Sequence, residues 1–175
     1  GLLHLYVHWM EMSPFPQRAL RQGDRLRELV PDSGHLVHMP THIDVLCGNY
    51  RDVVVYNQKA VVVDRKFLAR EGALNVYAMY RTHNHHFIIY GAMFLGQFEP
   101  AIKAAEELIA TTPDALLRIA SPPMADFIEG YISTKQHVLV RFGKWREIIA
   151  QELPKDRDLY CSTTAMILYA KGLAH

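Results

Sequence analysis

The feature that most constrains the fold is a recurring turn, in which a glycine is followed two residues later by an aromatic side chain. This turn occurs at Gly48–Tyr50, Gly96–Phe98 and Gly143–Trp145, and Pro14 marks an equivalent turn near the beginning. Glycine permits the left-handed backbone conformation in which many helices end. Apolar residues on both sides of these turns recur at helical spacing, and strand-like alternation is nearly absent. The sequence therefore predicts an all-α fold of helices joined in pairs.

Even the valine-rich stretch at residues 53–63 has helical rather than two-residue spacing, so it is expected to be a helix. The expected helices run over Leu2–Met12, Pro16–Leu29, His38–Cys47, Tyr50–Ala69, Ala73–Leu95, Glu99–Thr111, Pro122–Phe142, Trp145–Gln151 and Asp158–Ala174.

The clearest repeating unit is Gly91–Pro113. Within it Ala101 lies five residues after Gly96, and Pro113 lies seventeen residues after it. A small residue at the first of these places lets two helices approach closely, and proline ends the second helix because it cannot continue one. This arrangement resembles the tetratricopeptide repeat, a helix-turn-helix unit of about 34 residues.

Other parts of the chain repeat the same steps, since Ala19 and Pro31 lie five and seventeen residues after Pro14. The glycine turns are 48 and 47 residues apart, so the helices or connectors are longer than in the standard repeat. The resemblance implies one α-α superhelical solenoid domain over residues 1–175. Its units would span about 1–31, 35–70, 73–113 and 122–152, with a last helix at 158–174. Because helical patterns run to both ends, we expect a fragment of a longer solenoid.

Three short segments are also similar to a group of microbial repeat proteins of largely uncharacterised function. These segments are Leu3–His8, His38–Asp44 and Ser121–Asp126. This similarity implies the same helical-repeat fold and no particular reaction.

Histidines occupy a fixed register relative to the turns. Eight of the ten lie six, ten or thirteen residues before a turn, and Tyr90 fills another position of this register. The eight are His4, His8, His35, His38, His42, His83, His86 and His137. Steps of three and four residues lie on one helical face. In tetratricopeptide repeats the first helix of each pair lines the concave groove, so the resemblance places these side chains on the groove wall.

Two pairs in this register have the spacing of a helical metal site. His4 and His8 are four residues apart, and His38 and His42 repeat that spacing. Axes of neighbouring helices are about 8–10 Å apart, so imidazoles from two helices can meet at one ion. We therefore expect these four histidines to bind a divalent transition metal ion, for which Zn²⁺, Cu²⁺ or Fe²⁺ would suit the nitrogen ligands.

Further residues are expected around that ion. Glu11 lies one turn after His8, and Asp44 closely follows His42, so either carboxylate could ligate the metal or orient a ligand. The remaining members of the register are expected to line the groove and contact a bound molecule. They are His35, His83, His86, Tyr90 and His137. The run Thr82–His86 could also form a second metal site, or simply begin a helix in solvent.

Alternatives to a metal site remain open on the sequence alone. The imidazoles could form a metal-free groove for acid–base catalysis or anion binding, or they could be structural residues inherited between repeats. The fold could instead be a scaffold for a peptide or protein, or a spacer within its own longer chain. Peptide-tail clamps commonly use Lys, Arg and Asn, whereas these positions hold His, Tyr and Ser, which favours the metal.

Composition narrows the classes of function. The chain has 175 residues and a net charge of +1, which argues against nucleic acid and anionic membranes as partners. It lacks an apolar run of the roughly 20 residues that span a bilayer. The two cysteines favour a reducing compartment, and we expect a cytoplasmic location. Nucleotide-binding, serine-hydrolase and thiol-redox motifs are absent, so the sequence leaves open whether the protein is an enzyme.

Overall fold

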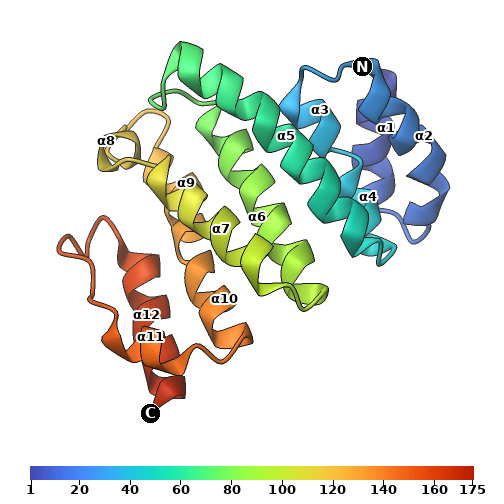
Figure 1. The fold of residues 1–175 in the computed structure, drawn as a ribbon. Coiled ribbons are helices and arrows are strands. Elements are labelled where there is room, and N and C mark those ends of the chain that lie inside the picture. Colours follow the sequence, from blue (N-terminus) through green and yellow to red (C-terminus); the bar gives the residue numbers. More distant parts are fainter.

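The computed structural model describes residues 1–175 and contains helices but no β-strand, which confirms the all-α class. Figure 1 shows the helices in chain order. They are α1 (Leu2–Glu11), the 3₁₀ helix η1 (Pro16–Ala19), α2 (Leu20–Leu29), α3 (Gly34–His38), α4 (Thr41–Leu46), α5 (Tyr50–Glu71), α6 (Ala78–Phe94), α7 (Phe98–Ala110), α8 (Asp114–Leu117), α9 (Met124–Ile132), α10 (Thr134–Arg141), α11 (Trp145–Ala150) and α12 (Cys161–Ala174). No helix combines the length and the hydrophobicity that crossing a bilayer requires.

The three turn glycines adopt the backbone conformation that the sequence predicted. Gly48, Gly96 and Gly143 have φ angles of 77°, 68° and 64°, which L-residues with a side chain rarely adopt. Each stands just after a helix and before the next one, at the α4–α5, α6–α7 and α10–α11 turns. These glycines therefore set where three helix pairs reverse direction.

Pro40 separates two helices, α3 and α4, in a region where the sequence predicted one helix. The sequence predicted a single helix over His38–Cys47, but α3 ends at His38 and α4 begins at Thr41. Pro40 has no N–H and cannot complete the ladder of backbone hydrogen bonds. The backbone nevertheless stays near helical values at Met39 and Pro40, so the chain direction is nearly kept.

Other boundaries also differ from the expected ones. The stretch 122–142 forms two helices, α9 and α10, that meet at Ser133, and the short helix α8 was not expected. α6 begins at Ala78 rather than Ala73, because Gly72 has a φ of 74° and the chain turns after it. The shifted beginning of α6 lies at a helix end, where sequence patterns define boundaries least well, whereas the division at Ser133 and the helix α8 were missed.

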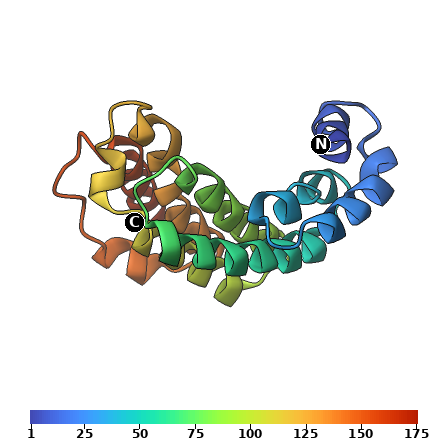
Figure 2. The ribbon, with the colours of Figure 1, turned by 90° about the horizontal axis from the view of Figure 1, so that it is seen from above.

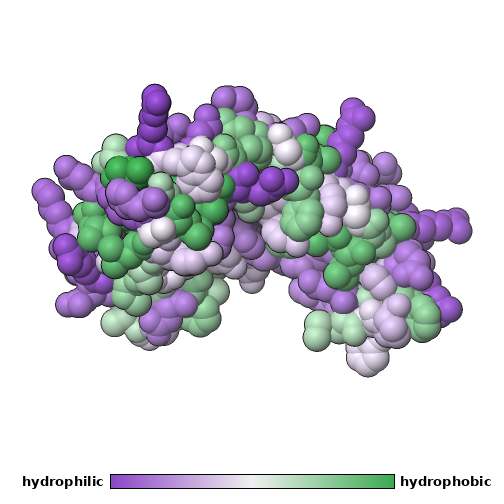
Figure 3. Space-filling model, turned by 90° about the horizontal axis from the view of Figure 1, so that it is seen from below, coloured by the Kyte–Doolittle hydropathy of each residue, from purple (hydrophilic) through white to green (hydrophobic).

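The helices follow an arc whose two ends curve toward the same side, with α5 on its outer side (Figure 2). Figure 3 shows the molecule hollowed between those ends. α5 packs against α6, and α6 packs against α7, while α3 contacts both α5 and α6. α1 contacts α4, so the first, third, fourth and sixth helices come together on the inner side of the arc.

Two main apolar clusters hold this arrangement together. The larger one joins α5 to α10 and includes the fully buried Ile89, Leu108 and Ile128. The smaller one joins α1 to α4 and includes Val7 and Ile43. The histidines lie where α1, α3, α4 and α6 meet, so well-packed elements on both sides hold their backbones in place.

Candidate metal centre

Six histidines converge from four helices at this meeting point. α1 carries His4 and His8, α3 carries His35 and His38, α4 carries His42, and α6 carries His83. They form two groups of three, His38–His42–His83 and His4–His8–His35, each with one ligand atom per residue and all atoms of a group within 4.8 Å of one another. We call the first the inner trio and the second the outer trio.

In the inner trio the Nε2 atoms of all three imidazoles face one another. Nε2 of His42 lies 2.9 Å from Nε2 of His38 and 3.3 Å from Nε2 of His83. His38 is fully buried, and the other two rings are partly buried. The break at Pro40 leaves His38 and His42 on one face, since the backbone between them stays nearly helical.

The opposite nitrogens of these rings are occupied by other side chains. Nδ1 of His38 donates to Oδ1 of Asn57 at 2.7 Å, and Nδ1 of His42 donates to Oε1 of Glu11 at 2.6 Å. The Asn57 amide cannot be reversed, because its Nδ2 donates to the carbonyl oxygen of Val53, which can only accept. On the third ring, Nδ1 of His83 lies 3.4 Å from the hydroxyl of Tyr131.

These contacts fix which nitrogens carry protons. A neutral imidazole has one N–H, and in His38 and His42 it is on Nδ1. Their Nε2 lone pairs therefore point at each other across 2.9 Å. Two lone pairs at this distance repel, and a positive charge between them, either a proton or a metal ion, would relieve that repulsion. A proton can bridge only one pair of nitrogens, whereas a metal ion can accept lone pairs from all three rings.

Burial disfavours the protonated forms of His38 and His83 in the inner trio. Desolvation holds the pKa of His38 well below its ordinary value, with the neighbouring His42 and His83 adding to the effect. The same two kinds of cause, burial first, lower the pKa of His83 to about 3. The hydrogen bond from His42 lowers the pKa of Glu11, so this carboxyl is ionised and accepts that bond. Neutral imidazoles with free lone pairs are the form that binds metals.

The outer trio repeats the convergence nearer to solvent. Nε2 of His4 lies 3.1 Å from Nε2 of His35 and 3.1 Å from Nε2 of His8. His8 is exposed, whereas His4 and His35 are partly buried. Burial and then the charges of His4 and His8 lower the pKa of His35 to about 4. Nδ1 of His35 is buried and has no hydrogen-bond partner.

The separations suit a tetrahedral ion. Metal–nitrogen bonds of about 2.0–2.1 Å at tetrahedral angles place neighbouring ligand nitrogens about 3.3 Å apart. Two of the three Nε2–Nε2 distances in each trio, from 2.9 to 3.3 Å, lie close to that value, and all ligand atoms of a trio lie within 4.8 Å of one another. Three histidines leave one position of a tetrahedral ion for water or substrate, as in catalytic rather than structural zinc sites.

The four histidines expected at one ion are thus divided between two groups. His4 and His8 belong to the outer trio, and His38 and His42 belong to the inner one. Each pair is completed by a residue that the sequence placed among the groove-lining positions, namely His35 or His83, and His83 also belonged to the run considered as a second metal site. Oε1 of Glu11 accepts a hydrogen bond from Nδ1 of His42, as expected of a carboxylate that orients a ligand.

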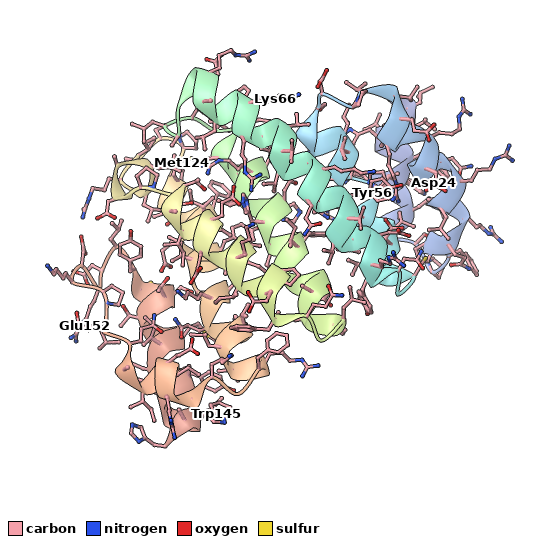
Figure 4. All side chains as sticks on the ribbon, in the orientation of Figure 1. Asp24, Tyr56, Lys66, Met124, Trp145 and Glu152 are labelled. Carbon is pink, nitrogen blue, oxygen red and sulfur yellow. The ribbon has the colours of Figure 1, made fainter.

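Asp44 lies away from both trios and serves another purpose. Its Oδ2 accepts from Nη2 of Arg27 at 2.6 Å, in an ion pair whose two side chains are buried. Burial raises the pKa of Asp44 in spite of this partner. The Arg27 guanidinium lies 4.0 Å from the ring centre of Tyr56. Tyr56 is on the face of α5 that is turned toward α2, which carries Asp24 (Figure 4). Two residues apart on a helix, Asp44 and His42 point to nearly opposite faces, which explains the departure from expectation.

The remaining residues of the register lie further along α6 and beyond. The ring of His86 is 6.3 Å from that of His83 and 5.2 Å from that of Tyr131. Tyr90 lies 6.4 Å from His86, and His137 is exposed. None of these three belongs to a trio. The run Thr82–His86, considered as a possible second metal site, does not form a group of its own, since His83 joins the inner trio and Nδ1 of His85 lies against the carbonyl oxygen of Arg81.

Sequence reasoning missed Asn57 and Tyr131, which contact the far nitrogens of the inner trio. For Asn57 a signal existed, since it is one of the two amides, with Gln58, within the valine-rich stretch. In the structure Asn57 is fully buried. A buried amide needs partners, and a buried imidazole is a natural one. No sequence signal connects Tyr131 with His83, which are 48 residues apart.

A cavity of about 330 Å³ borders the inner trio at His83. Its other lining residues are mostly apolar or aromatic: Val76, Met79, Tyr80, Phe127 and Tyr131. It belongs to α6 and α9 and the segment before α6. A small molecule in this cavity would lie beside the His83 ring.

Comparison with known proteins gave no relative, since no protein-family model, curated protein or solved structure matches the chain.

Proposed function

We propose that this protein binds a divalent transition metal ion through Nε2 of His38, His42 and His83. The observation that carries the proposal is the opposed pair of lone pairs on His38 and His42, fixed by the hydrogen bonds to Asn57 and Glu11. Imidazole ligands of metal ions usually donate their second nitrogen to a carboxylate or carbonyl in this way, which orients the ring and raises its basicity.

Neutral imidazoles and no thiolate suit Zn²⁺, Cu²⁺ or Fe²⁺, with copper first in intrinsic affinity. The coordination position left by three ligands would hold a water molecule, whose pKa a zinc ion lowers to about 7. The apolar cavity beside His83 supports a role as a metalloenzyme site that acts on a small molecule. The helix pairs around it would form a tetratricopeptide-like solenoid, which the left-handed turn glycines and the fully buried Ala19 and Ala101 support.

Zinc titration of tag-free, chelator-treated protein tests the proposal. His83→Ala should weaken the tightest Zn²⁺ binding by more than the roughly 10–100-fold that loss of an orienting group produces. His86→Ala is the matched control, since it removes a partly buried histidine one turn along the same helix but outside both trios. Unchanged zinc affinity in a folded His83→Ala protein would reject the proposal.

A second candidate function is a scaffold that binds a peptide or protein in the hollow of the arc without metal. The exposed side chains of Val76, Tyr80 and Phe127, beside the cavity at His83, favour it. This alternative predicts that chelator treatment leaves partner binding unchanged.

A further inference from the structure

We infer that the protein binds a second transition metal ion through Nε2 of His4, His8 and His35, next to the ion of the inner trio, so that the two ions form a paired centre. This inference rests on the proposed function of the inner trio and extends it from one ion to two.

The outer trio has the same ligand geometry as the inner one. The central imidazole, His4, has two Nε2 neighbours at 3.1 Å, one from its own helix and one from α3. A single ring nitrogen has either one proton or one lone pair, so it cannot form two well-directed hydrogen bonds at once. One cation among the three nitrogens satisfies all of them.

The two trios are neighbours. His35 of the outer trio and His38 of the inner trio lie three residues apart on α3, and their rings are stacked with centres 6.2 Å apart. Each ring presents its Nε2 to its own trio. Two ions bound there would consequently lie side by side rather than at independent sites.

Charge balance points to Glu11 as the group between them. Its Oε1 accepts from His42 of the inner trio, and it lies one turn after His8 of the outer trio on α1. One carboxylate between two otherwise neutral ligand sets reduces the repulsion between two dications.

The two sites differ in the contacts of their ligands. In the inner trio a protein side chain contacts the second nitrogen of every ring, whereas Nδ1 of His35 has no partner and His8 is exposed. Orienting contacts of this kind are worth about 10–100-fold in metal affinity. The outer ion should therefore bind more weakly than the inner one, by about that factor.

The test is the zinc stoichiometry of tag-free, chelator-treated chain, measured by calorimetry and by elemental analysis after equilibrium dialysis. Wild type should bind two ions in two phases. His35→Ala should retain only the tighter ion, His83→Ala only the weaker one, and the double variant neither. His86→Ala should still bind two, and circular dichroism should show that every variant is folded.

Each other outcome is decisive. One ion that survives His35→Ala but not His83→Ala overturns the second site and leaves the proposed function standing. One ion lost in both single variants means one shared ion, which also overturns the pair. An ion lost only in His35→Ala overturns the proposed function itself. With two Cu²⁺ ions bound, electron paramagnetic resonance should show dipolar broadening, and two unbroadened signals would overturn their adjacency.

Discussion

Asn57 shows how a single buried amide can fix the chemistry of a site. Its Nδ2 donates to Thr41 and to the carbonyl oxygen of Val53, so its Oδ1 is left for Nδ1 of His38. This arrangement leaves His38 no other tautomer when neutral, and the lone pair of its Nε2 turns toward the inner trio. The ligand state of His38 is thereby set by a residue that contacts no ion.

Asn57→Ala should therefore lower the affinity for the tighter Zn²⁺ ion by about 10–100-fold, because His38 loses its orienting acceptor. It should also destabilise the fold by about 1–3 kcal/mol, since buried polar groups lose their partners. Calorimetric zinc titration and thermal unfolding measure the two effects.

A matched control is Asn84→Ala. Asn84 is equally buried, but its side chain hydrogen-bonds to Asp64 rather than to a histidine. This control should lose stability and keep its zinc affinity. Equal losses of zinc affinity in the two variants would contradict the orienting role of Asn57.

At the scale of elements, the turns place the helices that carry the ligands. Gly48 ends the turn after α4, which carries His42, and Gly96 reverses the chain after α6, which carries His83. Both have positive φ angles with open space where a side chain would project. Backbone conformation alone therefore requires glycine at these two turns.

Gly96→Ala should destabilise the fold by about 1–2 kcal/mol, because alanine is strained in the left-handed region. Gly130→Ala is the matched comparison, since Gly130 lies within α9 in a right-handed conformation and also has open space around it. Alanine there should stabilise by about 0.5–1 kcal/mol through helix propensity. Urea denaturation gives both values, and stabilisation by Gly96→Ala would contradict the role of the turn.

At the scale of the whole molecule, gathering neutral histidines makes the metal-free fold sensitive to acid. Burial, as the largest cause, lowers the pKa values of His35, His83 and His86 to about 4, 3 and 4. Above pH 6.5, the ordinary histidine pKa, both folded and unfolded chains hold these rings neutral, so they add no pH dependence. Below it the unfolded chain takes up protons that the folded chain does not, and stability falls as pH falls.

The melting temperature of the metal-free protein should accordingly be several degrees lower at pH 5.5 than at pH 7.5. For a chain of this size, a loss of one kcal/mol of stability lowers the melting temperature by about 2–4 °C. Raised pKa values of Asp44 and Asp64 act in the opposite direction but at lower pH, where carboxyl groups titrate. His83→Gln should show a smaller drop, because it removes the histidine whose pKa, about 3, is the lowest of these three. A melting temperature that rises between pH 7.5 and 5.5 would contradict this expectation.

The sequence predicted the all-α class and the three glycine turns, because helical periodicity and left-handed glycines are local properties. It also identified the histidine register, since spacings of three and four residues define one helical face. It missed the break at Pro40 and placed the beginning of α6 too early, because the ends of helices depend on competing local and tertiary contacts. It also did not indicate that Asp44 forms an ion pair with Arg27.

Which histidines share a group was decided by the tertiary structure alone. The spacing of His4 with His8 and of His38 with His42 was visible in the sequence, but the third member of each group comes from a different helix. Periodicity describes one helix at a time, whereas the packing of the helices brings His83 of α6 to His42 of α4 across 41 residues. The sequence by itself determined that imidazoles line one side of several helices, and only their packing determined which nitrogens meet.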